Sequence, residues 1–349
     1  MSAEPTTKPL RVVQWATGTV GASAMHGVLS HPALELVGVR VYSESKDGKD
    51  AGELCGLPAT GVKATRDIES ILALKPDCVL YMPESTDVED VCQLLESGAN
   101  IVTTRAEFFN PEKMEPELRE RVEAACLAGG ASIHATGSSP GFITEALPIV
   151  LTSLSRRLDL LVIDEFANCI DGCSEEMLLN VMGFGETPEA FARRRHAERD
   201  RVFEDSLSVL GDAIGKPVET FELTSEFAVA RTPTKLHNVT IPAGTVGGQR
   251  VVVTGLHQGR PLLRFRSNWF VTTDLEPHWD LRGDGWRVTV EGDTPLEVTI
   301  GFPIAPQDRQ ATLPRLTAHR PVNAIPYVCA AWPGIVTTAD LPQVLAQLR

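Results

Sequence analysis

The stretch Arg11-Val-Val-Gln-Trp-Ala-Thr-Gly-Thr-Val-Gly21 decides the fold. An apolar run leads into a turn of small residues, and a helix-compatible segment follows over 22–29. A strand, a turn and a helix in this order bring a nucleotide pyrophosphate to the helix N-terminus, where the dipole and unpaired N–H groups attract it. Gly18 lets the backbone approach the phosphates, and Gly21 lets the helix pack closely on the strand. The turn residues expected to bind the cofactor are Thr17, Gly18, Thr19 and Val20.

This motif departs from the usual dinucleotide fingerprint at one position. Ala16 stands where the first glycine of G-x-G-x-x-G is expected. An ordinary glycine-containing turn between strand and helix is therefore the alternative interpretation, and the rest of the chain has to decide between the two.

Composition restricts the classes of function. The chain has 349 residues, a net charge of -14, 43% hydrophobic and 22% charged residues. A soluble protein is expected, with no nucleic-acid partner and no affinity for anionic membrane surfaces, because both carry the same sign of charge. Residues 1–9 are polar and predict a disordered tail rather than a secretory signal, and no run is long enough to span a membrane.

Seven scattered cysteines indicate reduced thiols in a cytoplasmic protein. Cys169 and Cys173 are the only close pair. They have no second cysteine pair or histidine at zinc-site spacing, so no metal site is expected.

The first part of the chain alternates strand and helix patterns, which is typical of βαβ units and a doubly wound parallel sheet of the Rossmann type. The strands are predicted at 11–15, 35–42, 77–82, 100–104 and 131–135. The helices are predicted at 19–30, 66–74, 86–97, 115–128 and 140–154.

The pattern then changes to that of an α+β domain. A strand is predicted at 158–168, mostly helical structure at 174–214, and a mixed or antiparallel sheet of long strands over 219–302. Two last helices are predicted at 317–331 and 340–348. The expected organisation is a tail at 1–9, a dinucleotide-binding domain at 10–150, a substrate and dimerisation domain at 151–314, and C-terminal helices at 315–349 that return to the first domain.

The end of the second strand indicates which dinucleotide binds. An acid about 20 residues beyond the glycine motif normally selects NAD, and no acid lies at 41–43. Arg40, Ser43 and Lys46 are suited to a 2′-phosphate, so NADP(H) is predicted. Glu44 keeps NAD(H) open, and a solvated surface turn is the plain alternative.

Loops after two further strands are expected to face the nicotinamide, because ligands bind beyond the carboxyl ends of parallel strands. Met82, Pro83 and Thr104 lie in these loops. Glu107 follows directly and precedes two phenylalanines. A carboxylate there either binds a cation, since its desolvation is otherwise costly, or caps a helix or forms an ion pair with a neighbour.

Residues 136–146 predict a second turn that leads into a helix. Ser138 or Ser139 is suited to the N-cap and Pro140 to the first helical position. This element would place Phe142 and Ile143 in a pocket over the nicotinamide, or else simply start a helix between domains.

The chain resembles the 2,4-diaminopentanoate dehydrogenase and native amine dehydrogenase family, which is distantly related to dihydrodipicolinate reductase. The motifs that carry the resemblance are Val13–Gly21, Lys49–Leu54, Thr136–Phe142, Met182–Gly185 and Pro321–Pro326. The resemblance implies a homodimeric NAD(P)-dependent enzyme that interconverts amines and carbonyl compounds through an imine. In this family a carboxylate after the fourth parallel strand holds the amine nitrogen, and Glu107 matches that position. The His-His and Lys pattern of dihydrodipicolinate reductases is absent, so lysine biosynthesis is not expected.

The resulting hypothesis is reductive amination of a ketone or aldehyde with ammonia, and its reverse. Phe142, Ile143, Met182 and Phe184 are candidate pocket walls, with ordinary core packing as the alternative. Asn323 is a candidate for the nicotinamide carboxamide, because an amide both donates and accepts hydrogen bonds. Two other functions stay open: a reductase for C=O or another C=N bond that works without ammonia, and a catalytically silent NADP(H)-binding sensor.

Overall fold

The computed structural model describes residues 8–170, 173–193 and 201–348, in two compact units. The first unit comprises Met1–Phe142 and Pro314–Arg349, and the second comprises Ile143–Leu313. Most of the predicted tail therefore lies outside the described residues. In the described part, no helix is both long and apolar enough to cross a membrane.

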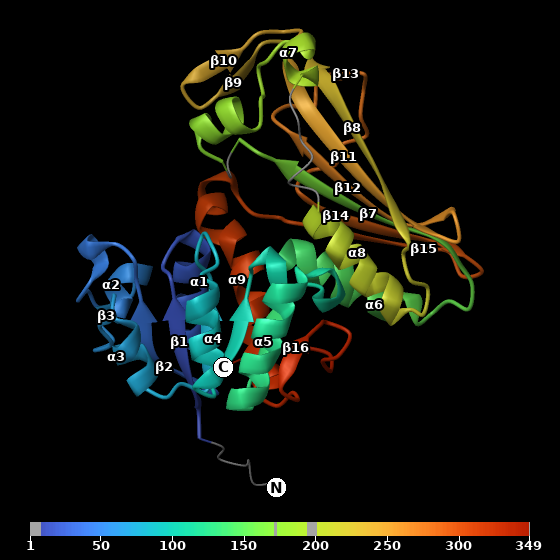
Figure 1. Cartoon of the computed structure of the whole chain (residues 1–349). Coiled ribbons are helices and arrows are strands. Elements are labelled where there is room, and N and C mark those ends of the chain that lie inside the picture. The colour runs from blue at the N-terminus through green and yellow to red at the C-terminus, as the bar shows by residue number, and fades with distance from the viewer. Residues whose placement is uncertain (1–7, 171–172, 194–200, 349) are drawn as a thin grey trace, which may run out of the picture. The chain divides into compact units, whose positions relative to one another are not determined.

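The first unit is built on a seven-stranded, entirely parallel sheet (Figure 1). Its order is β16-β6-β5-β4-β1-β2-β3. The Rossmann-type sheet is thus confirmed, and its predicted strands are all present. The bounds are β1 (Leu10–Trp15), β2 (Leu34–Arg40), β3 (Ala64–Thr65), β4 (Cys78–Tyr81), β5 (Asn100–Thr103), β6 (Ser132–Ala135) and β16 (Gly334–Val336).

Helices cover this sheet, and their ends are set by local sequence. Asp67 and Asp87 cap α3 and α4 by accepting hydrogen bonds from backbone N–H groups, and α5 ends at Gly130, which has a φ of 66°. Side chains of α1 and α9 share one hydrophobic cluster with the sheet strands, while α4 packs against α5. The helices are α1 (Thr19–Ser30), α2 (Ala51–Cys55), α3 (Ile68–Ala73), α4 (Val88–Glu96), α5 (Pro116–Gly129) and α9 (Arg309–Val328).

Helix α9 runs antiparallel to the strands of the first unit. Near its start, the Thr317 and Ser138 hydroxyls lie 2.8 Å apart, beyond the carboxyl end of β6. At its end, the Val328 carbonyl accepts a 2.7 Å hydrogen bond from Ser132, the first residue of β6. The C-terminal half of α9 therefore lies toward the amino ends of the strands.

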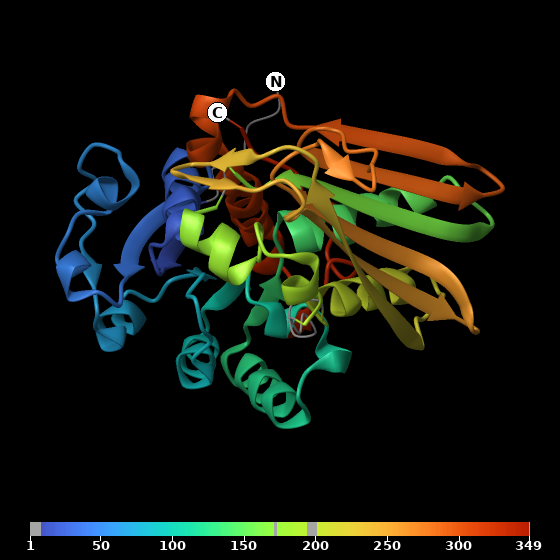
Figure 2. The same ribbon diagram turned by 90° about the horizontal axis from the view of Figure 1, so that it is seen from above.

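The second unit contains a seven-stranded mixed sheet of order β13-β8-β11-β12-β7-β14-β15, as predicted for an α+β domain. The green strand β7 lies between β12 and β14 in Figure 2, parallel to β12 and antiparallel to β14. Helix α8 packs on β11 and β12, and Phe203 stacks on Phe265 with ring centres 4.0 Å apart. The strands are β7 (Leu158–Asn168), β8 (Thr220–Ala230), β11 (Val246–His257), β12 (Arg260–Phe270), β13 (Leu275–Glu276), β14 (Gly285–Gly292) and β15 (Leu296–Gly301), with a hairpin of β9 (Thr234–Leu236) and β10 (Val239–Ile241).

The helical predictions for this region were only partly right. The segment 174–214 contains a helical turn at Met177–Val181, α7 (Pro188–Ala192) and α8 (Arg201–Ala213), with 194–200 outside the described residues. Pro140 does not start a helix: its ψ is 170°, Gly141 has a φ of 115°, and the regular helix α6 spans Leu147–Thr152. These backbone angles form a turn that the N-cap pattern alone does not distinguish from a helix start.

The C-terminal predictions also need correction. No helix forms at 340–348 in the described residues; Leu341 and Val344 instead pack on the core from an irregular segment. A stretch this short is a marginal helix on its own. Helix α9 begins before the predicted 317, because it tolerates Pro314 in its interior.

Candidate active site

The glycine turn after β1 has the shape of a phosphate cradle. A Cβ on Gly18 would meet no atom within 4 Å, whereas one on Gly21 would lie 2.3 Å from the Ala16 carbonyl oxygen. No described side chain caps the start of α1, and its first turn holds no acid. The open space at Gly18 and the uncapped N–H groups therefore fit a dinucleotide pyrophosphate.

Ala16 adopts the conformation of the glycine that it replaces. Its φ is 70°, in the left-handed region that glycine prefers. The buried Gln14 side chain supports the turn by donating a 2.9 Å hydrogen bond from Nε2 to the Ala16 carbonyl. The turn thus keeps its shape without the first glycine.

Two cationic side chains lie at the end of β2 beside this turn. Arg40 places its guanidinium 5.3 Å from the ring centre of Trp15 and 5.1 Å from that of Tyr42. Lys46 Nζ donates hydrogen bonds of 2.9 and 3.1 Å to the carbonyl and hydroxyl oxygens of Thr17. Ser43 is exposed, and its hydroxyl lies 2.7 Å from that of Ser45.

A carboxylate cluster, defined by Thr86, Arg105 and Glu107, lies beyond β4 and β5. Glu107 Oε1 accepts hydrogen bonds from Thr86 Oγ1 (3.0 Å) and Arg105 Nη2 (2.8 Å). Arg105 also donates from Nε to Thr86 Oγ1 (3.0 Å) and from Nη1 to the Glu84 carbonyl (2.6 Å). Arg105 therefore joins the two loops and fixes one oxygen of Glu107.

The sheet places this cluster on the same edge as the glycine turn. Strands β1, β4 and β5 are neighbours and parallel, so their carboxyl ends meet. Thr103 Oγ1 donates to the Tyr81 carbonyl (2.6 Å) and accepts from the Arg105 N–H (3.0 Å), while Met82 N–H bonds the Trp15 carbonyl (3.1 Å). These bonds align the three loops with one another.

The second oxygen of Glu107 is left for another partner. Oε2 is buried and has no hydrogen-bond partner among the described residues, although the side chain as a whole is 34% exposed. Burial opposes ionisation of Glu107, but the hydrogen bonds and charge of Arg105 outweigh it and hold its pKa below the ordinary value. The group is thus a carboxylate at neutral pH with one oxygen available to a donor.

The remaining predicted site residues are placed differently. Met82 and Pro83 are buried and Thr104 half-buried at this edge. Phe142 is the last residue of the first segment of the first unit, and its N–H donates a 2.9 Å hydrogen bond to the Gly137 carbonyl in the turn after β6. Asn323 does not lie at the carboxyl edge of the sheet. It is in the C-terminal half of α9 and faces the C-terminal half of α1, and this position does not support its predicted contact with the nicotinamide.

The other candidate pocket walls belong to the second unit. Ile143 is fully buried, and Met182 and Phe184 lie in a hydrophobic core cluster with 7% and 1% of their surfaces exposed. Both residues thus pack in the core of the second unit, and their role as pocket walls stays a prediction.

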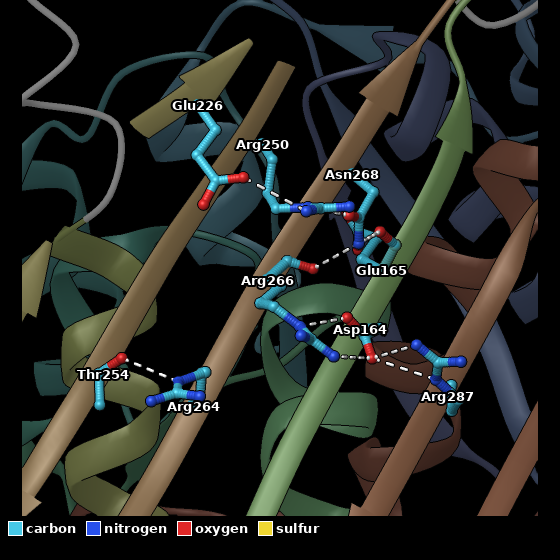
Figure 3. Close-up of polar contacts among 9 residues, drawn as sticks. All are labelled: Asp164, Glu165, Glu226, Arg250, Thr254, Arg264, Arg266, Asn268 and Arg287. Carbon is cyan, nitrogen blue, oxygen red and sulfur yellow. Dashed lines mark hydrogen bonds and ion pairs between the residues drawn. The ribbon is translucent and has the colours of Figure 1, made fainter. Parts of the chain in front are cut away.

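The second unit carries a polar array that the sequence analysis did not identify. Figure 3 shows it on one face of the mixed sheet, which we name the arginine face: Arg250, Arg264, Arg266 and Arg287 around Asp164. Asp164, only 2% exposed, accepts a bidentate pair from Arg266 (2.5 and 2.7 Å) and a 3.0 Å bond from Arg287. The alternate residues Leu263 and Phe265 are buried, as expected for a sheet with one apolar face.

Comparison with known proteins decides the family. Residues 142–348, more than half of the chain, match the model of the 2,4-diaminopentanoate dehydrogenase C-terminal domain. The chain belongs to this family. It is 30% identical over 347 residues to an amine dehydrogenase of Streptomyces virginiae, covering 95% of this chain and 96% of that one. It is 24% identical to the 2,4-diaminopentanoate dehydrogenase of Acetoanaerobium sticklandii, over 93% and 92% of the two chains.

A solved structure supports the same fold. The amine dehydrogenase from Mycobacterium smegmatis superposes with a TM-score of 0.77 at 24% identity, covering 97% of each chain. Membership of the 2,4-diaminopentanoate dehydrogenase family makes the chain an oxidoreductase of the class that acts on CH–NH₂ groups with a nicotinamide cofactor.

The sequence analysis of this protein did not identify two residues of the carboxylate cluster, Arg105 and Thr86. The ion pair given as the alternative role of Glu107 is present, with Arg105 as its partner. The spacing Arg105-x-Glu107 was a usable signal for that pair. Thr86 lies 21 residues from Glu107 in a different loop, and only the folded sheet brings it near.

Proposed function

We propose that this protein is an amine dehydrogenase that reversibly converts a small amine into a ketone or aldehyde and ammonia. The observation that carries the proposal is the Glu107 carboxylate, held by Arg105 at the carboxyl edge that also bears the glycine turn. A nicotinamide dinucleotide supplies or accepts the hydride when bound. Thr17, Gly18, Thr19 and Val20 would hold its phosphates, with Met82, Pro83 and Thr104 toward the reacting ring.

Glu107 has two tasks in this mechanism. Its unpartnered oxygen accepts a hydrogen bond from the substrate ammonium, so that the C–H bond to be broken is oriented. During oxidation the ammonium first releases a proton to solvent, which the alkaline pH of the assay favours. The carbon of the resulting neutral amine then loses a hydride, and the carboxylate stabilises the positive charge of the iminium that forms. Water then adds to the iminium, and loss of ammonia gives the carbonyl compound. Arg105 keeps the carboxylate ionised and in place.

A panel of amines, assayed with NADP⁺ and NAD⁺ at alkaline pH, tests the proposal. Turnover is expected with at least one amine, and the reverse reaction with its carbonyl product is expected to require ammonium. Equal carbonyl reduction without ammonium would instead show a simple carbonyl reductase. Dinucleotide binding with no turnover on any amine would show a sensor.

We propose NADP(H) as the preferred cofactor, because Arg40 and Lys46 supply positive charge at the end of β2, no acid lies at 41–43, and Glu44 is exposed. Arg40→Gln should weaken NADP⁺ binding about tenfold and leave NAD⁺ binding within about twofold, since a charged hydrogen bond is lost only with the 2′-phosphate. Arg121→Gln, on the exposed face of α5, is the matched control. Calorimetric titration with equal losses for both dinucleotides would contradict the preference.

We also propose that the protein is a homodimer formed through the arginine face. Acidic side chains flank the arginines on both sides of the arginine face. By strand register, Glu222 and Glu226 on β8 and Glu297 on β15 point to the same side as the arginines. Such a face is self-complementary if the acidic side chains of one protomer lie over the arginines of the other. The protein, whose seven cysteines are free thiols, is proposed to act in the cytoplasm.

Sedimentation equilibrium tests the dimer. Among the described residues, the Arg264 side chain bonds only the Thr254 hydroxyl (3.1 Å), so Arg264→Glu reverses a charge without leaving Asp164 unpaired. A dimeric wild type, a monomeric Arg264→Glu variant and a dimeric Arg260→Glu control are expected. A monomeric wild type, or an equally dimeric Arg264→Glu variant, would overturn the proposal.

A further inference from the structure

The first unit contains a cavity that the proposed reaction does not use. Its volume is about 690 Å³, and it lies between α1, α9 and the C-terminal segment. Its α1 wall starts at His26, about 10 Å along the helix from the glycine turn. The lining residues are His26, Gly27, Leu29, Ser30, His31, Arg315, His319, Val322, Asn323, Gln347 and Leu348.

Three basic side chains face this cavity without protein partners. Arg315 and His319 are four residues apart on α9, and therefore share one face of the helix, while His26 stands opposite on α1. None of the three side chains forms a hydrogen bond or ion pair with a described residue. No aspartate or glutamate is among the described residues that line the cavity, although the chain has 46 acids against 32 lysines and arginines. An excess of positive charge at this cavity, in a protein of negative net charge, favours an anion.

The other walls suit a small organic body rather than a bare ion. Leu29 and Val322 offer apolar surface, and Asn323 and Gln347 offer amides that both donate and accept hydrogen bonds. Gly27 helps to shape the cavity, because a Cβ there would lie 3.3 Å from Val322 and 3.5 Å from His319.

The C-terminal segment borders the cavity through the exposed residues Gln347 and Leu348, and it is held to α9 just before them. The Leu345 N–H donates a 3.1 Å hydrogen bond to the Tyr327 hydroxyl, and Val344 packs on the core. The cavity is therefore part of the folded first unit.

We propose that this cavity is a binding site for a small organic anion. Phosphate or carboxylate oxygens of the ligand contact Arg315, His319 and His26, and its body lies against Leu29 and Val322. The site is separate from the proposed amine chemistry, because neither Glu107 nor the glycine turn is among the residues that line it.

Binding at this site is linked to protonation of His319. Burial, Arg315 and His26 lower the pKa of His319, so the free imidazole is mostly neutral at pH 7. The charged or titratable groups that face it are Arg315 on α9 and His26 and His31 on α1. A bound anion offsets their repulsion and raises that pKa, so the complex takes up a proton and binding tightens as pH falls.

Isothermal titration with citrate, inorganic pyrophosphate and AMP, at constant ionic strength and with saturating NADP⁺, tests the site. Saturable binding of at least one probe is expected. The variant Arg315→Gln/His319→Gln should weaken it about tenfold or more, because charged hydrogen bonds are lost. Arg121→Gln, outside the cavity, should bind as the wild type does.

Repeating the titration in buffers of different ionisation enthalpy should show proton uptake by the wild type and less by the single variant His319→Gln. Arg315→Gln alone provides a second, milder test if the double variant melts at a lower temperature. Absence of saturable binding for all three probes would overturn the proposal. So would binding that the variants leave unchanged, as expected if a probe occupied the glycine turn instead.

Discussion

At the residue scale, Ala16 shows how the dinucleotide turn tolerates an imperfect motif. Its left-handed φ of 70° costs about 1–2 kcal/mol for a residue with a Cβ, yet the turn keeps its form because Gln14 and Gly21 fit closely around the Ala16 carbonyl. The sequence predicted the close packing at Gly21, and the structure confirms it. It did not reveal the strain at Ala16, because backbone angles depend on the folded turn.

Ala16→Gly should stabilise the protein by about 1 kcal/mol, because glycine adopts a positive φ without steric cost. Urea unfolding measures the change. Ala125→Gly, a helix-interior control in α5, should destabilise by about 1 kcal/mol. If Ala16→Gly lowers stability as much as this control, the strain argument is wrong.

Substitutions of Gly18 and Gly21 should have different effects: the first should weaken dinucleotide binding, and the second should lower stability. Gly18→Ala places its methyl in open space, so it should fold normally and bind NADP⁺ at least tenfold more weakly as the methyl meets the phosphates. Gly21→Ala should lower the melting temperature, because its methyl would collide with the Ala16 carbonyl. Thermal unfolding and dinucleotide titration of both variants check this; normal NADP⁺ affinity in Gly18→Ala would refute the cradle.

At the element scale, short elements were the ones that sequence patterns missed. Strands β3 and β16 have two and three residues, too few for a hydrophobic period to show. Strand β3 is fixed instead by the loop before it: Asp50 caps α2 and accepts backbone N–H bonds from Thr60 (2.8 Å) and Gly61 (2.9 Å). One carboxylate thus closes the loop that leads into the strand.

This loop should loosen in acid. Hydrogen bonds from the backbone N–H groups of Thr60, Gly52 and Gly61 outweigh burial and lower the pKa of Asp50 from 3.8 to about 2. Because the folded pKa lies below the unfolded one, the stabilisation is complete above pH 4 and is lost as pH falls toward 2. Asp50→Asn should be less stable at pH 6, and its stability should fall less steeply between pH 5 and 2. Parallel acid-unfolding curves for both proteins would contradict this.

At the scale of the whole molecule, the chain leaves the first unit at Phe142 and re-enters it at Pro314. Local periodicity identified the doubly wound and α+β halves correctly, but contacts between segments almost 200 residues apart, such as Ser132 with Val328, are set only in the fold. The carboxylate cluster follows the same rule: the place of Glu107 after a strand left its role open between a cation site and an ion pair, and the family resemblance favoured the first. Its partner Thr86 was not predictable at all.

Removing residues 314–349 should therefore destroy the first unit. Ala318, Val322, Ala324, Ile325 and Val328 are at most 2% exposed. Each large apolar side chain contributes about 1.5–3 kcal/mol, so the total loss is comparable to the stability of a typical domain. A chain that ends at Leu313 should not bind NADP⁺, whereas one that ends at Leu345 should. NADP⁺ binding by the shorter chain would show that α9 is dispensable.

The most direct test of the central claim is steady-state amine oxidation by Glu107→Gln. The amide keeps the shape of the side chain and removes its charge, so kcat/KM should fall by about 10²- to 10⁴-fold while the Kd for NADP⁺ stays within about twofold. Glu112→Gln, an exposed glutamate paired with Arg119 nearby in the chain, should retain wild-type activity. Amine oxidation by Glu107→Gln within a few-fold of wild type would show that this carboxylate does not carry the reaction.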